Sequence, residues 1–345
     1  MNSVEKVNYK NKFEMQDLRL FLKENELNFD EDCDYTIVLR DSEDRIVATA
    51  SKTKNILKCF AIDSSMRGEG VSGKIVTDIL NKMFSEGYDS SLVFTKVENL
   101  ELFINMGYKE IASTDRVSLL EIGVNNIGKV IEEIKKEYGI DNITKKSMIV
   151  MNCNPFTLGH QYLIEQASKE SEEVIIFIVE EDKSVFPFNI RYKLVKEGCA
   201  HLKNVKVIPG TKYIISSATF PNYFLKKSDD ALLEYTKLDV TIAGKIFCPA
   251  FNITKRYIGE EPFCQMTAKY NESIKEIFPR FGVEVRVIPR KEIENRAISA
   301  TEVRKWLAKG DFEKLKGLIP EVTYKFLSSS EATEIIEKLK LKSQN

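Results

Sequence analysis

The spacing of hydrophobic residues in the first third of the chain predicts a compact unit of strands and helices. Residues 13–24 have helical spacing, which places Leu18, Phe21 and Leu22 on one face. Strand-like runs at 35–40 and 45–51 flank a polar turn, as in a hairpin. The pattern then predicts a strand, a helix, a short strand and a second helix, at 56–62, 75–84, 92–95 and 99–106.

From residue 147 onward, predicted strands and helices alternate, as they do in a parallel sheet. The predicted strands are 148–151, 174–179, 205–209, 239–246 and 283–288; the predicted helices are 189–198 and those of a tail at 321–341. We therefore expect an α/β chain in three parts. These are an α/β domain at 1–125, a charged connecting segment at 126–146, and a Rossmann-like parallel-sheet domain with a helical tail at 147–345.

Composition excludes several classes of protein. The 51 basic and 52 acidic residues nearly cancel, so we expect no broad nucleic-acid surface. No apolar stretch approaches the roughly 18 residues of a membrane span, and the first residues are too polar for a signal peptide. Six scattered cysteines without a Cys-x-x-Cys pair indicate reduced thiols, and hence a cytoplasmic protein.

The segment after the strand at 148–151 has the features of a phosphate-binding loop. It contains Pro155 and then Thr157, Gly159 and His160, at the start of a predicted helix. Glycine lets a ligand approach the backbone, and the N–H groups of a helix start attract anions. His160 would hydrogen-bond a phosphate oxygen; the alternative is that Thr157 is an ordinary helix N-cap.

A second helix start lies near the end of the chain. Ser299 and Glu302 have capping-box spacing, and Arg304 would lie one turn into this helix, where its planar fork can hold a phosphate. A capped surface helix with a solvated arginine is the alternative. Together, the two helix starts resemble the HIGH-type nucleotidyltransferase superfamily, whose members attack the α-phosphate of a nucleoside triphosphate.

Three further groups of residues are candidates for a substrate pocket. Ser216, Ser217 and Thr219 belong to a hydroxyl-rich loop, which is equally consistent with a capped turn. Arg256 precedes the adjacent acids Glu260 and Glu261, which could hold Mg²⁺, although such pairs are more often solvated turns. Arg256 could also stabilise phosphate charge, as could two other cations, Lys245 and Arg290.

The first part of the chain resembles the Gcn5-related acetyltransferases. Their phosphate loop has the form Arg/Gln-x-x-Gly-x-Gly/Ala, and the corresponding residues here are Arg67, Gly68, Gly70, Ser72 and Gly73. The resemblance implies a cradle for the pyrophosphate of a coenzyme-A-like group. Because we find no convincing general base, we expect this domain to bind such a group without catalysing acetyl transfer.

Four linked motifs resemble the citrate (pro-3S)-lyase ligase family over nearly the whole chain. They are 152–160, 216–221, 256–263 and 298–301. The resemblance implies that ATP, Mg²⁺ and acetate act on the thiol of the citrate lyase acyl carrier subunit, whose prosthetic group resembles dephospho-coenzyme A. The resemblance also gives Thr157, His160 and Arg304 catalytic roles. It implies that ATP is bound by a further set of residues: Asn152, Asn154, Pro155, Phe156, Gly159, Ser299 and Thr301.

Two other interpretations remain open at this point. One is a cofactor-synthesising nucleotidyltransferase fused to a working acetyltransferase. The other is a regulatory protein with a degenerate site, against which the intact helix-start residues count. The metal ligands and the oligomeric state are not predicted.

Overall fold

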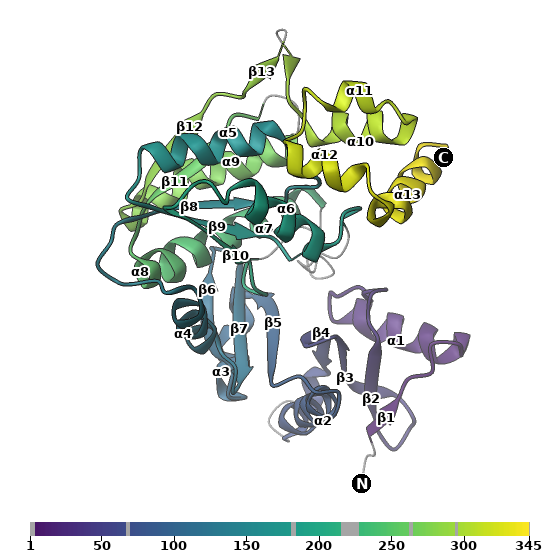
Figure 1. Cartoon of the computed structure of the whole chain (residues 1–345). Helices are drawn as coiled ribbons and strands as arrows, with labels where there is room; N and C mark the ends of the chain where they lie inside the picture. The colour runs from purple at the N-terminus through teal and green to yellow at the C-terminus, as the bar shows by residue number, and fades with distance from the viewer. Residues whose placement is uncertain are drawn as a thin grey trace. The chain divides into compact units, whose positions relative to one another are not determined.

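The computed structural model describes six stretches of the chain, which form two compact units. The described residues are 4–66, 70–180, 184–214, 228–261, 265–293 and 296–344. One unit holds the residues up to Val130 and the first part of a later helix, and the other holds the rest (Figure 1).

A mostly antiparallel sheet of seven strands forms the frame of the first unit. Its order is β1-β2-β3-β4-β5-β7-β6, and only β4 and β5 are parallel neighbours. The strands are β1 (Val4–Lys6), β2 (Tyr35–Arg40), β3 (Ile46–Thr53), β4 (Ile56–Ile62), β5 (Ser90–Lys96), β6 (Lys109–Ser113) and β7 (Val117–Gly123). Each strand predicted in this part is confirmed, whereas β6 and β7 had not been predicted.

Three α-helices lie wholly within the first unit: α1 (Lys12–Glu24), α2 (Val71–Ser85) and α3 (Leu100–Asn105). The side chain of Asn11 caps α1 by accepting from two backbone N–H groups. In α2, Ile75, Ile79 and Met83 recur every four residues and are fully buried. Burial of each such side chain stabilises the fold by about 1.5–3 kcal/mol. The amphipathic spacing read from the sequence therefore places these helices correctly.

Strands β4 and β5 are paired over only two residues of each strand, and beyond these residues they diverge. Ile56 lies opposite Leu92, and Leu57 opposite Val93. Cys59, in the middle of β4, has a φ of 46° at a shift in the register with β3. Because such an irregularity bends a strand, the sheet opens toward the end of β4, which leads to the turn before α2.

The second unit is built on a five-stranded parallel sheet with the order β10-β9-β8-β11-β12. The strands are β8 (Lys146–Met151), β9 (Glu173–Ile178), β10 (Val205–Pro209), β11 (Ile253–Gly259) and β12 (Glu284–Ile288). The strand order reverses between β8 and β11. In open α/β sheets, ligands bind outside the carboxyl ends of the strands at this kind of reversal.

Helices cover both faces of this sheet (Figure 1). Ile149 and Met151 of β8 pack into a core with residues of several helices, whereas Met148 and Val150 face the opposite side. The helices that contribute to the first core are α5 (Leu158–Lys169), α6 (Phe188–Gly198), α10 (Ala300–Lys309), α11 (Phe312–Leu315), α12 (Glu321–Leu327) and α13 (Thr333–Gln344). The unit also contains η3 (Ala243–Phe247), α8 (Cys248–Phe251), α9 (Gln265–Ile277), η4 (Phe278–Phe281) and η5 (Ser330–Ala332). Two helices, α4 (Ile127–Tyr138) and α7 (Ser228–Ile242), have their first part in the first unit and their second part here. A short antiparallel pair, β13 (Glu292–Ile293) and β14 (Arg296–Ala297), precedes α10.

The prediction of a strand at 239–246 is wrong, because this segment is helical. It covers the end of α7 and the π-helix η3. Val240, Ile242 and Ala243 are all buried, so the segment is apolar on most sides. Periodicity alone cannot distinguish a short apolar run of this kind from a buried strand. The fourth strand of the sheet is instead β11, for which we had predicted no strand.

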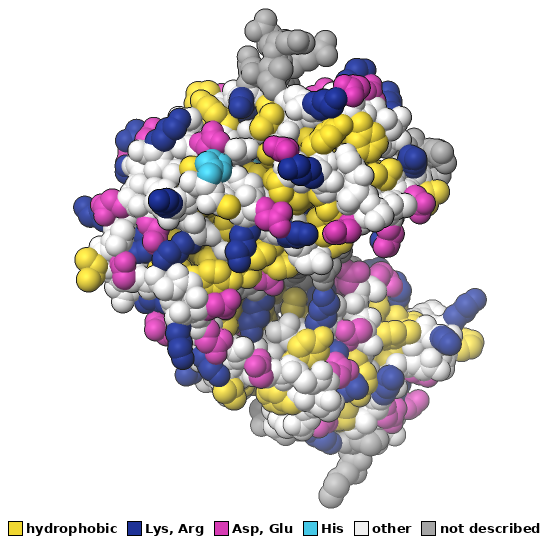
Figure 2. All heavy atoms as spheres, in the orientation of Figure 1, with side chains coloured by type: hydrophobic (Ala, Val, Ile, Leu, Met, Phe, Trp, Pro, Cys, Tyr) yellow, Lys and Arg dark blue, Asp and Glu magenta, His cyan; other side chains and the backbone are white. Residues whose placement is uncertain are grey.

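The surface carries charges of both signs. Figure 2 shows acidic and basic side chains interspersed over the visible face, which agrees with the balanced composition. In the described part of the chain, every helix is too short or too polar to cross a lipid bilayer.

We expect Gly198→Ala to destabilise the second unit, because α6 touches the ring of Phe156 at this position. A Cβ at Gly198 would lie 2.5 Å from Phe156 Cε1 and 3.3 Å from Val322 Cγ1. Overpacking of a fixed core ring costs about 1–3 kcal/mol. Gly317→Ala is the matched control, since a Cβ there meets nothing within 4 Å. Urea unfolding measures the free energy of unfolding of both variants. Equal values for the two variants would contradict the close contact at Gly198.

Candidate functional site

The segment after β8 ends in a capped helix start, as the sequence predicts. The Thr157 side chain caps α5 by accepting from His160 N–H, at 3.3 Å. In return, Thr157 N–H donates to His160 Nδ1 at 3.1 Å, which closes a capping box. Leu158 N–H donates to the Leu318 carbonyl at 3.0 Å. Of the backbone N–H groups of this first turn, the Gly159 N–H is therefore the one that stays available to a ligand among the described residues.

The contacts of His160 fix which of its nitrogens carries the proton. Because Nδ1 accepts from the Thr157 backbone N–H, the neutral ring carries its hydrogen on Nε2. Burial lowers the pKa of His160 to about 4, and the positive charge of Arg290 acts in the same direction. The ring also stacks on Phe156, with 6.2 Å between the ring centroids. His160 is thus a neutral, oriented hydrogen-bond donor at physiological pH.

A buried arginine that we had not predicted holds the β8–α5 loop (residues 152–157). Arg191 of α6 is fully buried, and its Nη1 donates to the Asn152 carbonyl at 2.8 Å and to Asn152 Oδ1 at 2.7 Å. Nη1 also donates to the Val179 carbonyl at 2.8 Å, and Nε donates to the Phe186 carbonyl at 2.9 Å. One side chain therefore ties together the segments that follow β8 and β9 and the one that precedes α6.

Both asparagines of this loop are occupied by protein contacts. Asn152 Nδ2 donates to Ser184 Oγ at 3.1 Å, while Asn154 Oδ1 accepts from Phe186 N–H at 3.1 Å. Their side chains hold the loop against the segment that leads into α6. Their predicted role in ATP binding stays a prediction.

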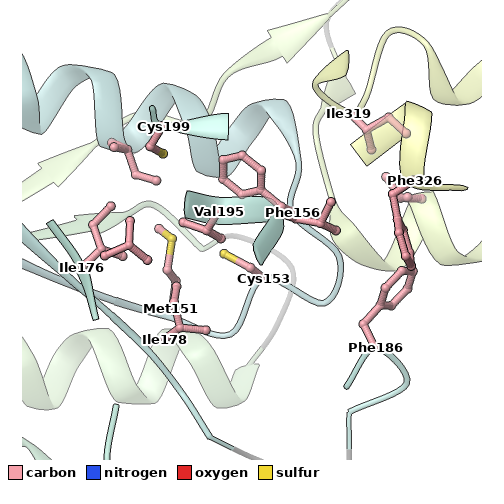
Figure 3. Close-up of a cluster of buried hydrophobic side chains, with 14 of the residues drawn as sticks. Met151, Cys153, Phe156, Ile176, Ile178, Phe186, Val195, Cys199, Ile319 and Phe326 are labelled. Carbon is pink, nitrogen blue, oxygen red and sulfur yellow. The ribbon is translucent and has the colours of Figure 1, made fainter. Parts of the chain in front are cut away.

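Phe156 and Cys153 lie in the core beneath the loop, as Figure 3 shows. Pro155 is also buried, and the Phe156 carbonyl accepts from Thr323 Oγ1 at 3.1 Å. The Phe156 ring thus supports the loop and is not exposed to a ligand. Burial raises the pKa of the Cys153 thiol, so this cysteine stays protonated and is not a nucleophile.

The second helix start lies directly beside the first. Ser299 Oγ caps α10 by accepting from Thr301 N–H at 3.2 Å. Arg304 Nη1 donates to the Asn154 carbonyl, and Nη2 donates to Thr301 Oγ1 at 2.9 Å. A Cβ on Gly159 would lie 3.5 Å from the Ile298 carbonyl oxygen. The two motifs, about 140 residues apart in the sequence, therefore form one site.

One detail of this helix differs from the prediction, and a second concerns the surroundings of Arg304. Glu302 accepts from the Trp306 indole at 3.3 Å and does not close a capping box. Arg304 is partly buried, which lowers its pKa, and its guanidinium contacts protein groups in this structure. The predicted contact of Arg304 with a phosphate stays a prediction.

Arg290 connects the acids after β11 with the second helix start. Its Nη2 binds a Glu261 carboxylate oxygen, its Nε donates to the Glu260 carbonyl at 2.8 Å, and its Nη1 donates to the Ile298 carbonyl at 3.3 Å. Glu261 is therefore engaged by a cation. In the described chain, no three His, Cys, Asp or Glu side chains gather as a metal site would require.

Several predicted site residues lie elsewhere or outside the described residues. Arg256 lies on β11 and is buried beside Asp239 and Ala243. Ser216, Ser217 and Thr219, and likewise Arg67 and Gly68, fall outside the described residues. In the first unit, Gly70 has a φ of 76° and begins α2 without a side-chain cap, and Ser72 and Gly73 lie in the first turn of that helix.

Comparison with known proteins finds relatives along most of the chain. The family described as the citrate lyase ligase C-terminal domain matches residues 146–327. A citrate (pro-3S)-lyase ligase from Escherichia coli K12 is 35% identical over 321 residues, which cover 91% of this chain and 90% of that protein. The corresponding ligase from Haemophilus influenzae is 35% identical over 318 residues, with 90% and 94% covered.

Two more distant similarities concern parts of the chain. A phosphopantetheine adenylyltransferase from Psychromonas ingrahamii is 41% identical over 58 residues, which cover 16% of this chain and 36% of that protein. The crystal structure of a GNAT-family acetyltransferase from Staphylococcus aureus Mu50 matches with 15% identity and a TM-score of 0.29, over 35% of this chain and 99% of that one.

We expect the His160 imidazole to remain neutral down to about pH 5. An ordinary histidine has a pKa near 6.5, and that of His160 is lowered to about 4. Between these values the unfolded chain binds the extra proton, so this group makes the folded protein less stable as the pH falls. An NMR titration of the ring measures the pKa, and His201→Ala removes the other histidine signal. A midpoint at or above 6.5 would contradict the described environment.

Proposed function

The chain belongs to the citrate (pro-3S)-lyase ligase family, and on that premise we propose that it activates acetate with ATP. The acetyl group is then delivered to the prosthetic-group thiol of the citrate lyase acyl carrier subunit. The observation that carries the proposal is the meeting of two helix starts at the reversal of the parallel sheet, joined by Arg304 and Asn154. We place this activity in the cytoplasm, where thiols stay reduced.

The first step is adenylation. A carboxylate oxygen of acetate attacks the α-phosphorus of ATP, the bond to the β-phosphate bridge breaks, and pyrophosphate leaves. His160 Nε2–H and the Gly159 N–H donate to phosphate oxygens while negative charge moves toward the leaving group. Arg304, Ser299 and Thr301 act on the outer phosphates. Asn152, Asn154, Pro155 and Phe156 hold the loop in place.

The second step forms the thioester. The prosthetic thiol attacks the acetyl carbonyl, the bond to AMP breaks, and the thiol proton is lost. We assign the recognition of the prosthetic arm to the first unit, whose α2 begins without a side-chain cap beside Gly70, Ser72 and Gly73. Such a helix start provides N–H groups for a pyrophosphate, together with Arg67 and Gly68. We further propose that the connecting segment at 126–146 separates this role from adenylation.

The described residues do not form a dedicated magnesium site. Glu261 is engaged by Arg290, and Glu260 has no cluster of acids around it. Mg²⁺ commonly binds through substrate phosphates and water, with few protein ligands. Magnesium would accordingly come with the triphosphate, and no step above requires a protein-bound ion.

A second candidate is adenylyl transfer to a phosphopantetheine-like phosphate, which the partial match to an adenylyltransferase favours. Acetate separates the two possibilities. The ligase releases pyrophosphate from ATP only when acetate is supplied, whereas the alternative requires a phosphate acceptor. Incubation with ATP, Mg²⁺ and the deacetylated carrier, with and without acetate, decides between them.

We expect His160→Ala to slow acetate-dependent pyrophosphate release by about 10²–10³-fold, as loss of one oriented donor does elsewhere. His160→Gln is the matched variant, because its amide N–H restores part of the donor function. Thermal unfolding shows whether each variant is folded. A folded His160→Ala protein with nearly normal pyrophosphate release would overturn the assigned role.

We expect Gly73→Glu to impair thiol acetylation without affecting adenylation. A Cβ at Gly73 meets nothing within 4 Å, so the carboxylate enters the start of α2 without a clash. Repulsion of a phosphate about 5 Å away costs on the order of 1–3 kcal/mol, which corresponds to about a 5- to 150-fold loss.

Gly73→Gln has nearly the same shape without the charge and serves as the control. Both half-reactions are measured separately for each variant. Equal carrier acetylation by the glutamate and glutamine variants would contradict a phosphate contact at this helix.

A further inference from the structure

One guanidinium joins three places at the carboxyl edge of the parallel sheet. Arg290 lies just beyond the end of β12, beside the residues that follow the neighbouring strand β11. Its Nη2 binds the Glu261 carboxylate, its Nε donates to the Glu260 carbonyl at 2.8 Å, and its Nη1 donates to the Ile298 carbonyl at 3.3 Å. The side chains of Arg290 and Glu261 are only 21% and 10% exposed. Because water screens this ion pair little, it holds its geometry more firmly than a surface pair does.

The segment that Arg290 holds leads directly into α10. Ile298 is buried, and its N–H donates to the Lys291 carbonyl at 3.2 Å, while its own carbonyl accepts from Arg290. Between these residues, the chain forms the short antiparallel pair of β13 and β14. Residues 290 and 291 therefore close the base of this excursion. Because Ser299, the cap of α10, directly follows Ile298, the contacts of Arg290 fix where α10 begins.

The carbonyl that Arg290 holds also lies against the first helix start. A Cβ on Gly159 would lie 3.5 Å from the Ile298 carbonyl oxygen and 3.6 Å from Ile298 Cβ. The His160 ring responds to the same arginine, because burial lowers the pKa of His160 and the positive charge of Arg290 lowers it further. One side chain therefore acts on the surroundings of both donors of the first helix start, and on the position of the second.

The geometry of the guanidinium matters here as well as its charge. A lysine can pair with Glu261 as a point charge, but its ammonium lacks the planar fork that reaches several acceptors in fixed directions. Two of the three acceptors of Arg290 are backbone carbonyls, so the fork sets the distance between residues 260–261 and residue 298. A displacement of about 1 Å at a reacting site can cost about 10²-fold in rate. The spacing of the two helix starts is therefore a quantity on which adenylation depends.

We propose that Arg290 is a positioning residue for adenylation: held by Glu261, it fixes the start of α10 against Gly159, so that both helix starts bind the same triphosphate. This assignment rests on the proposed function and adds to it the residue that sets the spacing of the two helix starts. Arg290 acts through the Ile298 carbonyl.

The main test is Arg290→Lys, which keeps the positive charge but removes the planar fork. We expect the kcat of acetate-dependent pyrophosphate release to fall about 10- to 100-fold and the KM for ATP to rise, because the two sets of donors no longer face one triphosphate. Arg286→Lys on β12 is the matched control, since Arg286 is half-exposed and pairs with Glu284 at 2.9 Å. A folded Arg290→Lys protein with normal kcat and normal KM for ATP would overturn the proposal.

The pKa of His160 separates the charge of Arg290 from its shape. NMR titration in a His201→Ala background measures this pKa without the other histidine signal. We expect it to stay at about 4 in Arg290→Lys and to rise in Arg290→Gln, which lacks the positive charge. A general loss of packing would change both variants alike. Equal values in the lysine and glutamine variants would therefore overturn the proposal.

Glu261→Gln tests the anchor and leaves Arg290 in place. The amide has nearly the shape of the carboxylate without the charge that orients the guanidinium, so we expect kcat to fall about 3- to 10-fold. Because both residues act as one unit, the double variant with Arg290→Lys should be about as slow as Arg290→Lys alone. The Mg²⁺ dependence should not change. Additive losses, or a changed Mg²⁺ dependence, would overturn the role of Glu261 as the anchor of Arg290.

A binding measurement keeps the result independent of turnover. The analogue α,β-methylene-ATP cannot release pyrophosphate, and calorimetry should give a Kd about 10-fold higher for Arg290→Lys than for the wild-type protein and Arg286→Lys. Equal Kd values would overturn the positioning role. Weakened binding to Arg290→Lys, together with no acetate-dependent pyrophosphate release by the wild-type protein, would support the positioning role and contradict the proposed function.

Discussion

The shape of the β8–α5 loop depends on one buried cation, Arg191. Its hydrogen bonds satisfy the carbonyls of Asn152, Val179 and Phe186, which belong to three separate segments. Leaving one buried carbonyl unsatisfied costs about 1–3 kcal/mol, so replacing this side chain would disturb all three segments together. The cost of burying the charge is offset because its donors find oriented acceptors.

That anchoring bears on the adenylation that we propose for this site. The N–H groups of a helix start stabilise developing charge only if they point at it before the reaction begins. Arg191 and Phe156 hold the loop from the core side, and Arg304 joins it to the start of α10. The Gly159 N–H and His160 Nε2–H are therefore held in place before the proposed reaction. Little reorganisation of these donors remains for the chemical step.

Local signals in the sequence predicted much of this arrangement. The Thr157 cap, the Ser299 cap and the hydrophobic spacing of α1 and α2 are properties of neighbouring residues, and the structure has each of them.

The sequence could not predict contacts that join distant segments. Arg191 and Arg304 bind backbone carbonyls, which every residue carries, so no pattern of side chains marks their partners. The strand wrongly predicted at 239–246 has a similar origin, since only tertiary packing decides between a buried helix and a buried strand.

The π-helix η3 gives its segment room to change in length. A wide turn of this kind holds one residue more than an ordinary helical turn, here over Ala243–Phe247. Removal of one residue would restore the ordinary turn and leave the phase of the following helix unchanged, so Phe251 of α8 would keep its contact with Phe177, at 5.8 Å between ring centroids. Composition is the tighter constraint, because a Cβ on Gly244 would lie 2.4 Å from Phe281 Cδ2.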